Sequence, residues 1–316
     1  ESQLKAEEVV KPAGFWATHR HLILILPWLV CGTCAAAPVL PIFNIVSQDF
    51  FGSHERAALV GSFFDTGGAV LAFVSSALIG LVSDSVGRRP FLVLGALCNF
   101  LTALALWQWP DNLYCYLTMK AVSSVVVTNG QYTVLAPYLA DVYRPDLRAR
   151  AFGLVFSTAL IPLMVLLWVA RLFVERFSLA FQIYAALTGV AFVYAVLFVP
   201  ESLSKANRVP FCWQKAATPF APIWAVLSRP LVLVAGVILF LITVSGAGIA
   251  EFALYFLRAK FGFGVQENAV VFFEIALTGV FTQTVVLGAL LRCTTEYNVL
   301  LLSVTCYALH AFGYAV

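Results

Sequence analysis

Ionisable side chains that can pair with one another interrupt an otherwise apolar chain. The clearest interruption is residues 80–89, which read Gly-Leu-Val-Ser-Asp-Ser-Val-Gly-Arg-Arg between two long apolar runs. This stretch puts one carboxylate, Asp84, a few residues before the guanidinium groups of Arg88 and Arg89. Arg–carboxylate pairs can be bidentate and are strong and directional. The stretch therefore predicts an ion-pairing turn between two helices, and Gly80 lets a neighbouring helix approach closely.

A second set of charges lies inside apolar runs, namely Asp65, Lys120, Glu251 and Glu274. Ionisable groups in such places are costly and usually face a bundle interior or a watery cavity. Desolvation raises the pKa of a buried carboxylate, which lets such a group carry a proton near neutral pH. Asp65 is the first candidate for proton coupling, although a purely structural polar contact, such as one with Thr66, is the alternative. Lys120 can attract an anionic group or pair with Asp65.

The two glutamates of this set have separate interpretations. Glu251 follows Gly246 and Gly248, which predict a weak point in its helix, and kinked helices often line transport sites. Glu274 belongs to the same candidate proton or substrate site, or it pairs across to the first half of the chain.

The elements that hold these charges are apolar segments of membrane-spanning length. The chain is 61% hydrophobic and 11% charged, whereas a soluble domain has about 25% charge. A spanning helix needs about 20 mostly apolar residues. Nine runs meet this need: 22–46, 57–82, 90–109, 113–139, 151–170, 177–199, 230–257, 264–291 and 297–316. We expect an all-α integral membrane protein with nine transmembrane helices and a short polar loop at 47–56.

A proline-rich polar stretch, 200–229, divides the runs into six and three. We therefore expect a cytoplasmic N-terminal segment (1–20), a six-helix N-terminal bundle (21–199), a cytoplasmic linker (200–229) and a partial C-terminal bundle (230–316). Thirteen of the 19 Lys and Arg residues fall on the face that holds the N-terminus, the 80–89 turn and the linker. Because positive charge concentrates on the cytoplasmic side, this face is predicted to be cytoplasmic.

Several other classes of function find no support in the sequence. No basic stripe interleaved with aromatic residues indicates nucleic-acid binding. The seven cysteines show no framework spacing, and Cys31 and Cys34 are interpreted as packing residues, with a redox or metal pair as the alternative. No nucleophile elbow or phosphate-binding glycine loop occurs. We expect no enzyme activity, no cofactor and no metal.

The charged turn carries a resemblance to a known family. Its spacing, G-x-x-x-D-x-x-G-R-R, resembles the signature loop between helices 2 and 3 of the major facilitator superfamily of transporters. Further similarities follow in 140–153, in Val-Pro-Glu-Ser-Leu at 199–203 and in Gly-Phe-Gly at 262–264. Together they resemble the hippocampus-abundant-transcript branch, relatives of the tetracycline-type exporters. Val82, Leu147 and Thr295 depart from the family pattern.

The resemblance implies major facilitator-type helical bundles, of which the second is incomplete, because family members have twelve helices and this chain stops in the ninth. A conformational latch is predicted to hold the cytoplasmic ends of the bundles together until they rock apart. An alternative is that such charges only fix topology. The predicted latch residues are Gly80, Asp84, Gly87, Arg88, Arg89, Asp141, Arg148 and Glu201.

Two functions remain from the sequence. The first is a secondary active transporter that moves a small solute by alternating access, with protons as the candidate coupling ion and the lipid bilayer as surroundings. Pro162 stands without the Gly-Pro-Gly-Gly cluster of drug antiporters, which argues against drug export. The alternative is a transporter-derived structural subunit of a larger membrane complex, which would apply if the chain naturally ends at its ninth helix.

Overall fold

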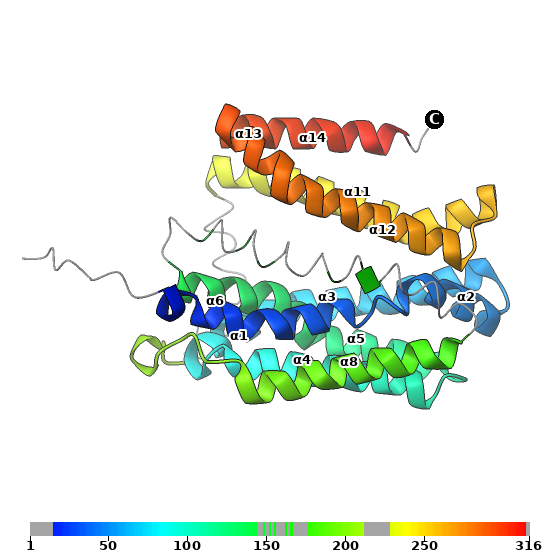
Figure 1. Ribbon diagram of the computed structural model, residues 1–316, viewed down its shortest axis with the longest axis horizontal. Coiled ribbons are helices and arrows are strands. Elements are labelled where there is room, and N and C mark those ends of the chain that lie inside the picture. The colour runs from blue at the N-terminus through cyan, green and yellow to red at the C-terminus, as the bar shows by residue number, and fades with distance from the viewer. Residues whose placement is uncertain are drawn as a thin grey trace, which may run out of the picture.

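The computed structural model describes residues 15–143, 148, 152, 155, 162, 165–166, 176–211 and 228–313, and within this part every regular element is helical (Figure 1). The first group of helices comprises α1 (Phe15–Cys34), α2 (Leu40–Phe51), α3 (His54–Val86), α4 (Arg89–Gln108), α5 (Leu113–Asn129), α6 (Leu135–Val142) and α8 (Phe177–Phe198). The second group comprises α11 (Pro230–Phe261), α12 (Val265–Phe281), α13 (Leu287–Cys293) and α14 (Glu296–Gly313). Single π-helical turns, Gly130–Val134 and Thr282–Val286, join α5 to α6 and α12 to α13.

The predicted apolar runs correspond closely to these helices. The run 90–109 matches α4, and 177–199 matches α8, within one residue at each end. Three helical stretches are long and apolar enough to cross a membrane: Glu55–Val86, Arg89–Gln108 and Phe177–Phe198. Shorter apolar helices occupy most of the other runs, so the full count of nine spans stays a prediction. The run 151–170 lies almost entirely outside the described residues.

The first predicted run is two helices rather than one. Residues 35–39 form turns around Pro38. Helix α2 has Pro41 in its first turn, where the N–H group that proline lacks would have no partner within the helix. The predicted polar loop at 47–56 is wrong, because α2 continues through Phe51 and α3 starts at His54. The connection is reduced to Gly52, with a φ of 74°, and Ser53, which accepts a hydrogen bond from the Arg56 backbone.

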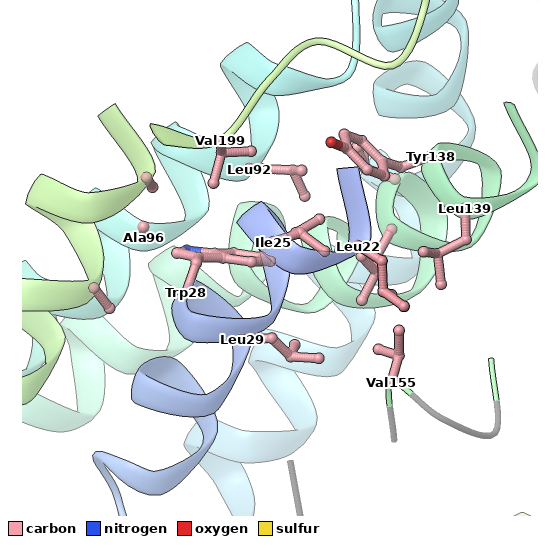
Figure 2. Packing of buried hydrophobic residues seen from close by; sticks show 14 of the residues in the cluster. Leu22, Ile25, Trp28, Leu29, Leu92, Ala96, Tyr138, Leu139, Val155 and Val199 are labelled. Atoms are coloured by element: carbon pink, nitrogen blue, oxygen red, sulfur yellow. The ribbon is translucent and has the colours of Figure 1, made fainter. Parts of the chain in front are cut away.

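The core of the first group lies where α1, α4, α6 and α8 meet. Figure 2 shows Ile25 and Trp28 of α1 beside Leu92 of α4 and Val199 at the end of α8. Tyr138 of α6 is fully buried in the same cluster. Its hydroxyl donates a hydrogen bond to the Pro200 carbonyl at 3.1 Å, which ties α6 to the residues that follow α8.

Helices α3 and α5 approach each other closely at Gly68. A Cβ on Gly68 would lie 2.9 Å from Ser124 Oγ and 3.2 Å from Ala121 Cα, and Ser124 Oγ donates a hydrogen bond to the Gly68 carbonyl at 2.7 Å. At Gly80 a Cβ would make only an ordinary 3.6 Å contact with Thr133. The close approach predicted for Gly80 therefore occurs three turns earlier on the same helix.

Helices α11 to α14 lie along one side of the first group (Figure 1). Within this second group α11 and α13 pack against α14, and α12 contacts α2 of the first group. Large apolar side chains are exposed along α3, α8 and α11, among them Phe63, Leu197 and Phe240. Exposed apolar surface of this extent suits contact with lipid.

The ends of the helices fall into two sets. The α3–α4 turn, the C-terminal end of α8 and the start of α11 lie at one end of the molecule, at the left of Figure 1. The α2–α3 and α11–α12 turns lie at the opposite end, at the right. This is the grouping that the Lys and Arg distribution predicts, and the assignment of the first end to the cytoplasm stays a prediction.

Candidate functional site

The charged turn between α3 and α4 is shorter than the motif suggests. Helix α3 continues through Asp84 to Val86, and only Gly87 and Arg88 separate it from α4. Gly87 has a φ of 122°, a conformation that side chains disfavour. A Cβ there would also overlap the carboxylate of Glu201. Backbone conformation and space therefore both require glycine at this position.

Glu201 caps the N-terminus of α4 from a distant part of the chain. Its Oε1 accepts hydrogen bonds from the backbone N–H groups of Arg88 at 2.8 Å and Leu203 at 3.1 Å, and its Oε2 accepts from that of Arg89 at 3.2 Å. The first N–H groups of a helix lack partners within the helix and carry a partial positive charge. Because no side chain at the start of α4 supplies a cap, the carboxylate of Glu201 fills this role.

Arg88 is the centre of the charged network. Its buried guanidinium lies 2.5 Å from Asp84 Oδ1 and 3.4 Å from Asp141 Oδ2, and it donates to Ser83 Oγ at 2.6 Å. Asp141 also accepts a hydrogen bond from Ser202 Oγ at 3.2 Å. These contacts join α3, α6 and the segment after α8.

The other two arginines of the predicted latch bind backbone carbonyls. Arg89 donates to the Val196 carbonyl of α8 at 2.5 Å. Arg148 donates to the carbonyls of Ala140 at 2.9 Å and Tyr143 at 3.1 Å, so it closes the C-terminal end of α6. Arginine near a helix C-terminus satisfies its free carbonyls and interacts well with its dipole.

The network connects the first group of helices with the start of the linker. The Val209 N–H donates to the Asp84 carbonyl at 3.1 Å, which fastens the linker to the end of α3. Among the described residues, the partners of Asp84, Arg88, Asp141 and Glu201 all precede residue 210. The network thus joins elements of the first bundle to one another, and the predicted contact of these residues with the second bundle stays a prediction.

Asp65 and Lys120 form an ion pair inside a cavity. Asp65 Oδ1 of α3 and Lys120 Nζ of α5 are 2.7 Å apart, and their side chains are 36% and 42% exposed. The cavity has a volume of about 490 Å³. It is lined by α2, α3, α4, α5 and α8, and Phe272 of α12 adds a wall from the second group. This volume is within the usual range for small-molecule sites, about 300–1,000 Å³.

Polar and aromatic side chains complete the lining around the pair. Tyr184 of α8 donates to Asn99 Oδ1 of α4 at 3.4 Å, and the hydroxyls of Thr102 and Ser123 lie 2.9 Å apart. Aromatic side chains form much of the remaining wall, namely Phe43, Phe51, Tyr116, Tyr184 and Phe272. Such a site can hold a small solute that has one charged group and an apolar body.

The structure separates the four predicted intrahelical charges. Asp65 and Lys120 come together, whereas Glu274 is exposed on α12 and is not among the residues that line the cavity. Glu251 belongs to α11, but its side chain lies outside the described part of the chain. Sequence reasoning missed Asn99 and Tyr184. The signal for Asn99 was an amide in the middle of the third apolar run, a position that favours an interior-facing polar group.

Comparison with known proteins defines the class. Residues 62–316 match the Major Facilitator Superfamily, and the chain belongs to this family. Among curated proteins, the hippocampus abundant transcript 1 proteins of Mus musculus and Homo sapiens are each 26% identical over 293 residues, which is 90% of this chain and 57% of the relative. The resemblance to this branch is therefore confirmed, and the chain spans little more than half the length of these relatives.

Solved structures share the fold. The crystal structure of the human organic anion transporter MFSD10 (TETRAN) matches with a TM-score of 0.65 at 17% identity, and the match covers 85% of this chain and 72% of the MFSD10 chain. The crystal structure of a D-xylose-proton symporter matches with a TM-score of 0.52 at 16% identity, and the match covers 84% of this chain and 67% of the symporter chain. At these identities the likeness supports the arrangement of helices and not the solute.

Proposed function

We propose that the chain acts as a secondary active transporter that moves a small solute across a membrane by alternating access. The observation that carries the proposal is the Asp65–Lys120 ion pair in the 490 Å³ cavity. Paired charges inside a membrane bundle usually mark a substrate or ion pathway. Membership of the superfamily supports an integral membrane transporter rather than an enzyme.

The position of the cavity supports alternating access. Its walls come mainly from the first bundle, and Phe272 of α12 closes part of it from the second. Rocking of one bundle against the other around a site at their boundary would expose that site to one side and then to the other. The network around Arg88 and Glu201 would let the first bundle move as one body. We propose the end that carries this network as the cytoplasmic one.

For the solute, we propose a compound with an anionic group that binds Lys120. An anion can take the place of Asp65 as partner of the ammonium group, and the aromatic wall would hold its apolar part. Human MFSD10, which shares the fold, is named an organic anion transporter, and the same class of solute is part of this proposal. Asp65 would then accept a proton, since it has lost its cation.

The test uses the purified full-length protein in liposomes that contain a pH-sensitive dye. Benzenesulfonate, which stays ionised and crosses a bilayer poorly without a carrier, is the anionic probe. Benzenesulfonamide is the neutral probe of similar shape, and protein-free liposomes give the background for both. We expect benzenesulfonate uptake above this background accompanied by proton movement, loss of uptake in Lys120→Met, and loss of pH dependence in Asp65→Asn. Asp111→Asn is the matched control, because Asp111 is exposed in the α4–α5 connection. Equal uptake of both probes would contradict anion binding, and pH dependence that survives in Asp65→Asn would assign the proton to another group.

A further inference from the structure

The two groups of helices meet at the end opposite the charged turn, through the contact between α2 and α12. Figure 1 shows α2 and the α11–α12 connection together at this end. The face of α12 turned inward carries Asn268, Ala269, Phe272 and Ala276, spaced as one side of a helix. We call this contact the α2–α12 closure, because both helices line the cavity that holds the ion pair.

Two amide side chains are buried on the helices of this closure. Gln48 of α2 is 7% exposed and Asn268 of α12 is 3% exposed. Neither the Nε2 nor the Oε1 atom of Gln48 has a hydrogen-bond partner in the described part of the chain, and Asn268 Oδ1 has none there either. Buried amides without partners are rare in stable contacts, since the large majority of buried polar atoms are hydrogen-bonded.

The energetic consequence has a definite direction. An amide that is buried without a partner has lost its hydrogen bonds to water and gained none in return. Separation of α2 from α12 would return to water those of these atoms that the contact covers. The two amides therefore destabilise the closed arrangement relative to the open one, whereas apolar groups such as Ala269 and Phe272 stabilise it.

We propose that Gln48 and Asn268 are the release residues of a gate at this end of the molecule. The unpaired amide atoms, both of Gln48 and the Oδ1 of Asn268, keep the α2–α12 closure reversible, so that the cavity can open on the side opposite the charged turn. The role rests on the proposed alternating-access function. It assigns to these two residues an effect on the open–closed equilibrium, with no contact to the solute.

The test measures the distance across the closure in the full-length protein by pulsed electron paramagnetic resonance. Nitroxide labels are attached at Glu55→Cys and Gln266→Cys, both exposed at this end, after replacement of the seven native cysteines. We expect Gln48→Leu and Asn268→Leu each to raise the ratio of short to long distances about tenfold, the effect of removing one unsatisfied buried amide. Asn268→Asp adds a buried charge and should shift the distribution to long distances.

Gln108→Leu is the control, because Gln108 is an exposed amide at the same end of the molecule. It should leave the ratio unchanged. If the leucine variants aggregate, Gln48→Met and Asn268→Met take their place. Leucine or methionine variants that behave like Gln108→Leu, or that favour long distances, would overturn the proposal. Because no solute is present, this outcome is independent of the transport assay: failed uptake with the expected distances would count against the proposed function alone.

Discussion

Loss of the Glu201 carboxylate should destabilise the first bundle far more than loss of an ordinary surface charge. The carboxylate accepts three backbone hydrogen bonds, from Arg88, Arg89 and Leu203. Its side chain is only 25% exposed. Removal of one helix cap costs about 0.5–2 kcal/mol, and a hydrogen bond to a charged group contributes about 1.5–3 kcal/mol. Since water can reach part of the site and replace some of these bonds, we expect Glu201→Ala to cost about 3 kcal/mol.

The assay is reversible unfolding of the full-length protein in mixed micelles by titration with a denaturing detergent. Glu201→Gln keeps one acceptor oxygen for two of the N–H groups but removes the charge, so we expect an intermediate loss of about 1–2 kcal/mol. Asp111→Ala, which removes an exposed carboxylate in the α4–α5 connection, should change the free energy of unfolding by less than about 0.5 kcal/mol. If Glu201→Ala were no more destabilising than Asp111→Ala, the capping role derived from the structure would be refuted.

The other predictions concern two glycines, each with a matched control glycine, and the Asp65–Lys120 ion pair. Gly87→Ala should lower the free energy of unfolding by about 2 kcal/mol or more, because it combines backbone strain with an overlap with the Glu201 carboxylate. Its control is Gly52→Ala, since Gly52 has a positive φ but open space around it. That variant should cost only about 1 kcal/mol in the same unfolding titration. Gly68→Val should separate α3 from α5 and lower the unfolding midpoint, while Gly67→Val, with nothing within 4 Å, should be tolerated; similar midpoints for the two would contradict the close approach. Asp65→Asn should fold normally and lose the pH dependence of uptake, as the liposome assay tests.

Helix positions were largely predictable because the signal for them is local. A run of about 20 apolar residues has few alternatives to a helix in a membrane protein, since every backbone polar group must be satisfied within the segment. The run 177–199 and helix α8 agree for this reason. The loop predicted at 47–56 failed because Ser47 and Gln48 are polar yet buried within α2. Polarity alone cannot indicate whether a neighbouring helix covers a side chain.

Only part of the candidate site could be predicted from local sequence patterns. A charge within an apolar run is visible in the sequence, and Asp65 and Lys120 were recognised as a possible pair on that ground. The cavity around them was not visible, because Asn99 and Tyr184 come from two other helices and meet only after packing. The sequence could not show that α5 packs tightly at Gly68 rather than at Gly80 either, since the same residue type stands at both places in the same run.

The sequence by itself determined that the chain is helical and apolar, where several of its helices lie and which turn carries the motif, because chain-local hydrophobicity and spacing decide these features. Only the tertiary structure decided that Glu201 caps a helix more than a hundred residues earlier, that Asp65 pairs with Lys120, and that Arg148 binds carbonyls at the C-terminal end of α6. Each of these depends on which helix ends and faces come together. That choice is made by packing between distant segments, which no local pattern records.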